Sequence, residues 1–331
     1  MRSLQAVVAV TTLALATAGC SAFSDGGDTK SGTSGARPEV VAAFYPLEYV
    51  AARVAGDHAK VTSLTKAGVE PHDLEINVQD TARIAAADLV VFESEFQPAV
   101  DETVAENAGG ETLDVADVVE LEPFEEHEDH DEHADEEGDE HADEEGEEGE
   151  EGEEDHEHGE FDPHFWHDPI RVAAFGDAVA TSLSELDPDH AADYAANAAD
   201  LRSDLEALDQ EFEAGLSSCE RDTIVVSHDA FGYLEKYGLH MASIAGLSPD
   251  AEPTPAAIAE LQQLIRREGI TTVFSETLVS PKTAETLAGD LGIESKVLDP
   301  IEGLTDETAD QDYLSLMRSN LAALRTANGC S

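Results

Sequence analysis

The chain has 331 residues, a length that suggests two domains or one large one, and 41% of them are hydrophobic, enough for folded cores. It carries 74 acidic and 17 basic side chains, which gives a formal net charge of -57. This balance argues against a nucleic-acid partner, because binding phosphates needs a basic surface.

Residues 1–20 have the features of a secretory leader. Arg2 is the only basic side chain of the N-terminal region of this leader, and the apolar run that follows is too short to span a bilayer. The ending Thr17-Ala18-Gly19-Cys20 resembles a bacterial lipoprotein processing site, which implies a lipidated Cys20. An ordinary signal peptide with an incidental cysteine is the alternative. Residues 21–37 are rich in Ser, Gly and Asp, so we expect a flexible tether.

Residues 38–124 alternate short apolar runs with helical patterns. The predicted strands cover residues 39–44, 61–65, 88–92 and 111–115. The predicted helices cover residues 46–55, 77–87 and 96–110. This alternation is typical of a parallel sheet flanked by helices.

Residues 125–160 form an acidic insertion with 17 Glu, 6 Asp and no Lys or Arg. The segment has no large apolar side chain to bury, so we expect disorder. Its six histidines lie among carboxylates, and we expect weak binding of several divalent ions. They are His127, His130, His133, His141, His156 and His158. A solvated charged spacer is the alternative interpretation.

Residues 161–217 hold two helical patterns, and the second could run for about 30 residues. Alternation returns in residues 218–331. Strands are predicted over 223–227, 239–244, 270–275 and 294–298. Helices are predicted from residue 230 and over 254–267, 281–289 and 311–327. The predicted fold is therefore α/β, with two lobes that each hold a parallel-type sheet flanked by helices, joined by a long backbone helix.

Two cysteines lie beyond the leader, Cys219 and Cys330. Export places them in an oxidising space, where an even pair favours a disulfide. Two free buried thiols are the alternative.

Three of the seven histidines outside the insertion lie where ligands would be expected. His72 and His228 follow predicted strands, and His164 precedes the first bridging helix. Asp299 follows the strand at 294–298. Ligands bind outside the carboxyl ends of parallel strands, so these side chains predict one site. Three imidazoles and a carboxylate suit tetrahedral Zn²⁺, although Cu²⁺ would also bind.

Other assignments stay open at this point. His167 is a spare candidate ligand, and water could replace Asp299. His58, His190 and His240 are interpreted as ordinary polar residues. Three histidines could instead hold the activated water of a secreted metallohydrolase, and the insertion alone could serve a surface zinc buffer. The HExxH, GxSxG and P-loop motifs are absent, so we predict that the chain is not an enzyme.

Several motifs occur in an order that resembles one family. They are Phe44-Tyr45-Pro46-Leu47, Val54-Ala55-Gly56-Asp57, Pro71-His72-Asp73, Ala87-Asp88-Leu89-Val90-Val91, Asp162-Pro163-His164-Phe165-Trp166, Ser227-His228-Asp229-Ala230-Phe231-Gly232-Tyr233 and Leu298-Asp299-Pro300. Together they resemble the zinc and manganese solute-binding lipoproteins of ABC importers, the cluster 9 proteins of the ZnuA type. The resemblance covers about residues 39–328.

This resemblance implies a cluster A-I clamp with one metal in the interlobe cleft, held by His72, His164, His228 and Asp299. Manganese members carry Glu at the third ligand position, so His228 points to zinc. A receptor for manganese or another divalent metal is the alternative within the family.

The family also implies a location and partners. It implies an extracytoplasmic monomer, anchored to the cell membrane through Cys20, that delivers Zn²⁺ to an ABC permease and its ATPase. Two segments depart from the family pattern, Phe92-Glu93-Ser94-Glu95 and His167.

Overall fold

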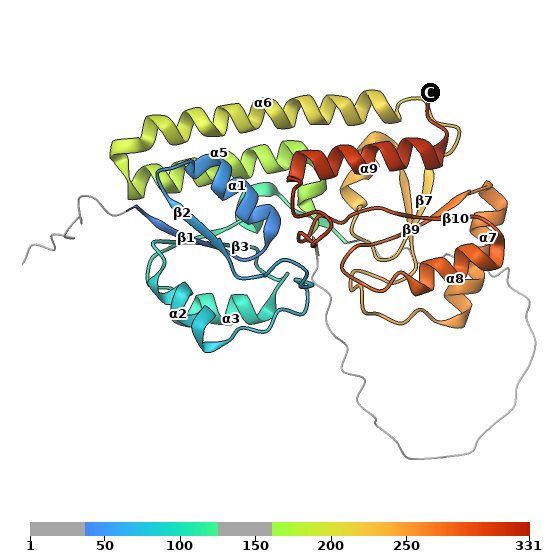
Figure 1. The fold of residues 1–331 in the computed structure, drawn as a ribbon, viewed down its shortest axis with the longest axis horizontal. Coiled ribbons are helices and arrows are strands. Elements are labelled where there is room, and N and C mark those ends of the chain that lie inside the picture. The colour runs from blue at the N-terminus through green and yellow to red at the C-terminus, as the bar shows by residue number, and fades with distance from the viewer. Residues whose placement is uncertain (1–36, 125–160) are drawn as a thin grey trace, which may run out of the picture. The chain divides into compact units, whose positions relative to one another are not determined.

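A computed structural model describes residues 37–124 and 161–331, and these form two parallel sheets with helices packed against them (Figure 1). The α/β prediction is confirmed. The predicted leader, Cys20, almost all of the tether and the acidic insertion lie outside the described residues.

The first sheet has the strand order β2-β1-β3-β4, and every neighbouring pair is parallel. In chain order the strands are β1 (Glu39–Ala42), β2 (Lys60–Ser63), β3 (Leu89–Phe92) and β4 (Glu111–Asp114). Central strands of a sheet covered on both faces need continuous apolar runs, and β1 and β3 supply them.

The helices of this first half pack on both faces of that sheet (Figure 1). They are α1 (Tyr45–Ala55), α2 (Val78–Ala86) and α3 (Pro98–Asn107), and this half also holds the single turn α4 (Ala116–Val119). Asn77 begins α2, since its side chain accepts from the backbone N–H groups of Gln79 and Asp80 in a capping box. The prediction did not include α4, because one turn is too short to show a period.

Two helices connect the halves. A 3-10 turn at Phe165–His167 leads into α5 (Pro169–Leu186), a second at Pro188–His190 follows, and α6 spans Ala191–Leu216. With 26 residues, α6 is slightly shorter than expected. It packs against α1 of the first half and against α9 of the second, so the predicted bridging role fits its contacts.

The second sheet repeats the plan with the parallel strand order β10-β9-β7-β8. Its strands are β7 (Thr223–Val226), β8 (His240–Ser243), β9 (Thr272–Ser275) and β10 (Glu294–Val297). Its helices are α7 (Pro255–Glu268), α8 (Lys282–Leu291) and α9 (Tyr313–Asn328). The helix expected from residue 230 is a 3-10 helix, η3 (Gly232–Tyr237), because the short connection ends at Gly238 with φ 83°.

A small antiparallel pair of strands lies on either side of the insertion in the sequence. It consists of β5 (Glu122–Pro123) and β6 (Phe161–Asp162). Two-residue strands leave no periodic signal, so the sequence did not predict them. The pair matters because β6 leads directly into His164.

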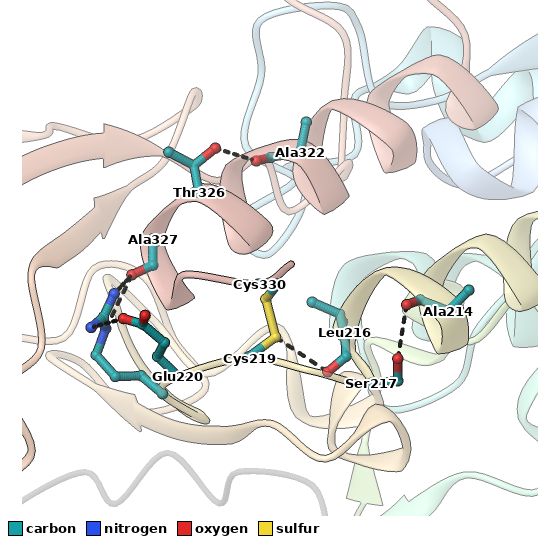
Figure 2. Close-up of a disulfide and its surroundings, with 10 residues drawn as sticks. Ala214, Leu216, Ser217, Cys219, Glu220, Ala322, Thr326, Ala327 and Cys330 are labelled. Carbon is teal, nitrogen blue, oxygen red and sulfur yellow. Dashed lines mark hydrogen bonds and ion pairs between the residues drawn. A yellow bond between two sulfur atoms is a disulfide. The ribbon is translucent and has the colours of Figure 1, made fainter.

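The C-terminus is fastened to the end of α6. A disulfide joins Cys219, just after α6, to Cys330, just after α9 (Figure 2). The backbone N–H groups of Glu220 and Arg221 also donate to the carbonyl of Asn328. Among the described residues, no helix combines the length and the apolar character needed to cross a bilayer.

Candidate metal centre

Loops from both sheets carry the histidines of the centre. His72 lies in the loop between β2 and α2, and His228 lies two residues after β7. His164 lies between β6 and α5. These loop positions bring the three imidazoles together.

The three imidazoles converge on one carboxylate oxygen. The Nε2 atoms of His72, His164 and His228 lie 3.4, 3.6 and 3.2 Å from Oε1 of Glu302. One donor atom from each of these four residues lies within 4.8 Å of the other three. The side chains of His164, His228 and Glu302 are fully buried, and that of His72 is 14% exposed.

The carboxylate in this group is Glu302, whereas the sequence pointed to Asp299. The structure does not bring Asp299 into the group. Its Oδ1 instead accepts from the backbone N–H of Ile301 at 2.8 Å, which closes a local turn. The available signal for Glu302 was a second acidic residue in the loop that follows the predicted strand at 294–298.

The turn that presents Glu302 is held in an unusual conformation. Ile301 has φ 62°, a region that β-branched residues rarely adopt. Trp166 Nε1 donates to the carbonyl of Pro300 at 2.7 Å, and Asn320 bonds both the N–H and the C=O of Asp299. Such strain costs about 1–3 kcal/mol and persists only where surrounding bonds enforce it. These bonds direct Glu302 toward the three imidazoles.

Buried carboxylates hold the far ring nitrogens of two histidines. Asp162 Oδ1 accepts from His164 Nδ1 at 2.7 Å, and Glu276 Oε2 lies 2.8 Å from His228 Nδ1. A carboxylate on Nδ1 fixes the tautomer that leaves Nε2 free to bind a metal.

The charges in the centre shift the pKa values of its groups. Burial lowers the pKa of His228, but the charges of Glu302 and Glu276 raise it well above its usual value. The pKa of His164 is also raised, because Asp162 outweighs its burial. His72 has a lowered pKa because burial dominates. Burial raises the pKa of Glu302, yet the surrounding imidazoles hold it well below its usual value.

Nε2 of His164 and Nε2 of His228 face Glu302 Oε1, but neither makes a hydrogen bond with any residue that the structure describes. Buried polar atoms are normally satisfied, because leaving one unpaired costs about 1–3 kcal/mol. A cation that accepts three lone pairs and one carboxylate oxygen fits this donor set.

Apolar rings cover one side of the centre. The ring centroid of Phe96 lies 4.6 Å from that of His72, and the Trp166 ring lies 5.2 Å from that of His164. Both aromatic side chains are buried. Such a wall lowers the local dielectric and strengthens attraction between a cation and Glu302.

The other histidines of the described chain lie outside the group. His167 is fully buried beside the Phe231 ring, and burial lowers its pKa to about 3. His58 stacks on His190 with ring centroids 4.0 Å apart, and His240 is exposed on β8. The six histidines of the insertion lie outside the described residues.

The chain matches a known family. Residues 40–327 match the family described as ZnuA, "Zinc-uptake complex component A periplasmic". The zinc-binding protein AdcA of Streptococcus pyogenes serotype M6 is 36% identical over 290 residues, which are 87% of this chain and 55% of that protein. The chain thus spans about half the length of these streptococcal relatives.

Two further matches cover almost all of the protein or domain compared. The high-affinity zinc uptake system protein ZnuA of Bacillus subtilis is 32% identical over 96% of this chain and 95% of its own. The crystal structure of the Zn(II)-bound ZnuA-like domain of Streptococcus pneumoniae AdcA superposes with a TM-score of 0.68 and 31% identity, over 88% of this chain and 99% of that domain.

Proposed function

The chain belongs to the ZnuA family of zinc-uptake components, and we propose that it is a receptor that binds one Zn²⁺ as cargo for uptake. The observation that carries the proposal is the convergence of three Nε2 atoms, two of them on fully buried side chains, on one oxygen of Glu302. Three nitrogen donors and one oxygen donor suit tetrahedral zinc, whereas Mn²⁺ favours oxygen-rich sites.

The ligands that we propose are His72, His164, His228 and Glu302, with Asp299 shaping the loop that carries the glutamate. The charge of the ion would be half neutralised by the carboxylate. This set differs from the sequence-based proposal only in its oxygen donor.

A binding role also fits the chemistry better than hydrolysis. A catalytic zinc keeps an open position for water, whereas four protein donors fill a tetrahedral shell. Family membership supports the same view, since these relatives are named for zinc binding or zinc uptake.

The remaining parts of the proposal concern location and delivery. Lipidation at Cys20 would hold the receptor outside the membrane, and residues 21–37 would tether residues 38–124 and 161–331 to it. The receptor would act as a monomer and pass the ion to an ABC permease driven by its ATPase. The names of relatives as lipoproteins and uptake proteins support this arrangement.

The test is calorimetry with metal analysis on the chain lacking residues 125–160. We expect one tightly bound zinc ion per chain. The variants His72→Ala, His164→Ala and His228→Ala should each lose the tight site, while His240→Ala, an exposed histidine on β8, should retain it. A deletion variant that binds no zinc would instead support a surface buffer. Equal binding by all four histidine variants would overturn the proposed centre.

A further inference from the structure

Asp162 connects the base of the insertion to the metal centre. It lies on β6, where it pairs with Glu122 of β5. Its Oδ1 accepts from both the backbone N–H and the Nδ1 of His164, at 2.9 and 2.7 Å. Any shift of Asp162 therefore changes the orientation of the His164 ring.

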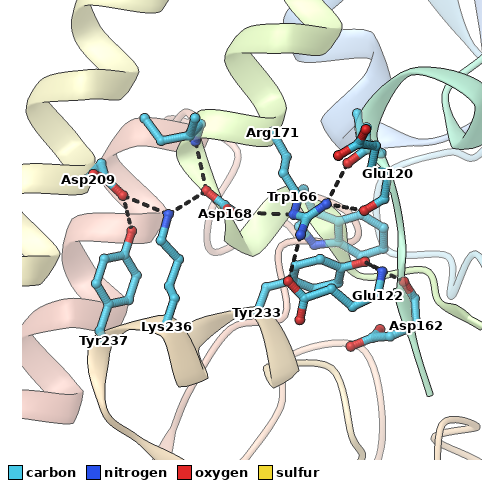
Figure 3. A network of polar contacts seen from close by, with 12 residues as sticks. Glu120, Glu122, Asp162, Trp166, Asp168, Arg171, Asp209, Tyr233, Lys236 and Tyr237 are labelled. Atoms are coloured by element: carbon cyan, nitrogen blue, oxygen red, sulfur yellow. Dashed lines mark hydrogen bonds and ion pairs between the residues drawn. The ribbon is translucent and has the colours of Figure 1, made fainter. Parts of the chain in front are cut away.

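Tyr233 fixes the backbone of Asp162 from the other half of the molecule. Its buried hydroxyl donates to the carbonyl of Asp162 at 2.8 Å and accepts from the N–H of Glu122 at 3.0 Å (Figure 3). One hydroxyl thus bonds both strands of the small β5–β6 pair. Tyr233 lies on η3, five residues after the ligand His228.

Gly232 leaves the space in which the carboxylate of the same aspartate lies. A Cβ atom at position 232 would lie 2.7 Å from Asp162 Oδ2. Real Cβ atoms essentially never approach a heavy atom this closely, so any larger residue would displace the carboxylate. Glycine is needed here for space and not for an unusual φ.

Arg171 fixes Tyr233 and β5 as a unit. Its guanidinium lies over the Tyr233 ring, 5.1 Å from the centroid, and donates to the carbonyl of Val119 at 2.6 Å and to Glu122 Oε1 at 2.6 Å (Figure 3). It also bonds the carbonyl of Glu120. A partly buried cation over an aromatic face contributes about 0.5–2 kcal/mol, so this anchor resists movement of η3.

We propose that Gly232 and Tyr233 are positioning residues for metal binding: they hold Asp162 so that it aims His164 Nε2 at the cargo ion. This rests on the proposed function. The segment that supplies His228 therefore also sets the geometry of His164, and two ligands more than 60 residues apart act as one rigid pair. The pairing gives a physical reason for Gly-Tyr in the motif that begins at Ser227.

The test compares Tyr233→Phe and Gly232→Ala with matched controls. Tyr233→Phe removes only the hydroxyl, and Tyr237→Phe removes the hydroxyl four residues along η3, which bonds Asp209 instead. Gly232→Ala adds the clashing methyl, and Gly289→Ala adds a methyl on α8 with no heavy atom within 4 Å. Loss of a partner of a ligand histidine weakens metal binding about 10- to 100-fold. We expect about tenfold weaker zinc binding for Gly232→Ala and about fivefold for Tyr233→Phe, with both controls unchanged.

Two further measurements separate positioning from general stability. The visible spectrum of the Co²⁺-loaded protein reports ligand geometry, and it should change in Tyr233→Phe but not in Tyr237→Phe. In an Asp162→Ala background, Tyr233→Phe should cost no further zinc affinity, because its route to His164 is gone. Additive losses, or wild-type spectra and affinity in both Tyr233→Phe and Gly232→Ala, would overturn the inference. Absence of zinc binding in the unmutated chain would instead refute the proposed function.

Discussion

Replacing Glu302 by glutamine tests which acid belongs to the metal centre. The substitution keeps the size of the side chain and removes its charge from a fully buried position 3.2–3.6 Å from three imidazole nitrogens. Removing one partner of a buried charge pair costs about 3–5 kcal/mol. At about 1.4 kcal/mol per factor of ten, zinc should bind about 100- to 4,000-fold more weakly.

The matched variant is Asp299→Asn. Its amide oxygen can still accept from the Ile301 N–H, so the turn should persist and zinc affinity should change by less than about threefold. The assay is competition for zinc against a chelator of known affinity, on the chain lacking residues 125–160, at pH 7.5.

The ranking of the two variants decides the question. If Asp299→Asn weakens zinc binding more than Glu302→Gln does, the ligand set drawn from the structure is wrong. Thermal unfolding of both metal-free variants controls for loss of fold.

Four other predictions follow from the structure. Zinc must displace protons from His164 and His228, whose pKa values are raised. As the pH is lowered, zinc affinity should therefore start to decrease before the pH reaches about 6.5. A zinc affinity that calorimetry finds constant from pH 8 to pH 5 would contradict this. In the metal-free chain, the raised pKa of His228 stabilises the fold below about pH 6.5, and this stabilisation is lost as the pH rises through the pKa of the folded state. The melting temperature of the metal-free chain should therefore be higher at pH 6 than at pH 9. The variant His228→Gln should reduce that difference. Replacing both Cys219 and Cys330 by serine should lower the free energy of unfolding, measured in denaturant titrations, by about 2–5 kcal/mol. Zinc affinity should change less than twofold. An unchanged unfolding midpoint would refute the stabilising role of the disulfide. Trp166→Phe removes the hydrogen-bond donor to the buried carbonyl of Pro300, so it should destabilise the chain by about 1–3 kcal/mol. It should also weaken zinc binding, because the loop that carries Glu302 loses this bond. Wild-type zinc affinity would show that the bond does not position the loop.

The sequence predicted the fold well where continuous apolar runs or helical spacing mark an element. Predicted strands at 39–44 and 88–92 correspond to β1 and β3, and the helix predicted at 254–267 corresponds to α7. A helix was predicted from residue 230, and the structure has the short 3-10 helix η3 there. The β5–β6 pair was not predicted, because two-residue strands carry no recurring pattern.

The site was predictable to the extent that ligands follow strand ends. His72 and His228 were found in this way and His164 from its place before the first bridging helix, and the three lie together. Glu302 was missed because the chain turns sharply after β10: Ile301 adopts φ 62° and Asp299 closes the turn with its own side chain. No propensity rule predicts a left-handed isoleucine, since that conformation depends on tertiary bonds from Trp166 and Asn320.

X-ray absorption at the zinc edge tests the central claim most directly. The sample is the chain lacking residues 125–160, loaded with one equivalent of zinc. The account predicts three imidazole nitrogens at about 2.0–2.1 Å and one carboxylate oxygen at about 2.0–2.2 Å, with one imidazole lost in each of His72→Ala, His164→Ala and His228→Ala. A shell made mainly of oxygen, or one that keeps three imidazoles in any of these variants, would contradict it.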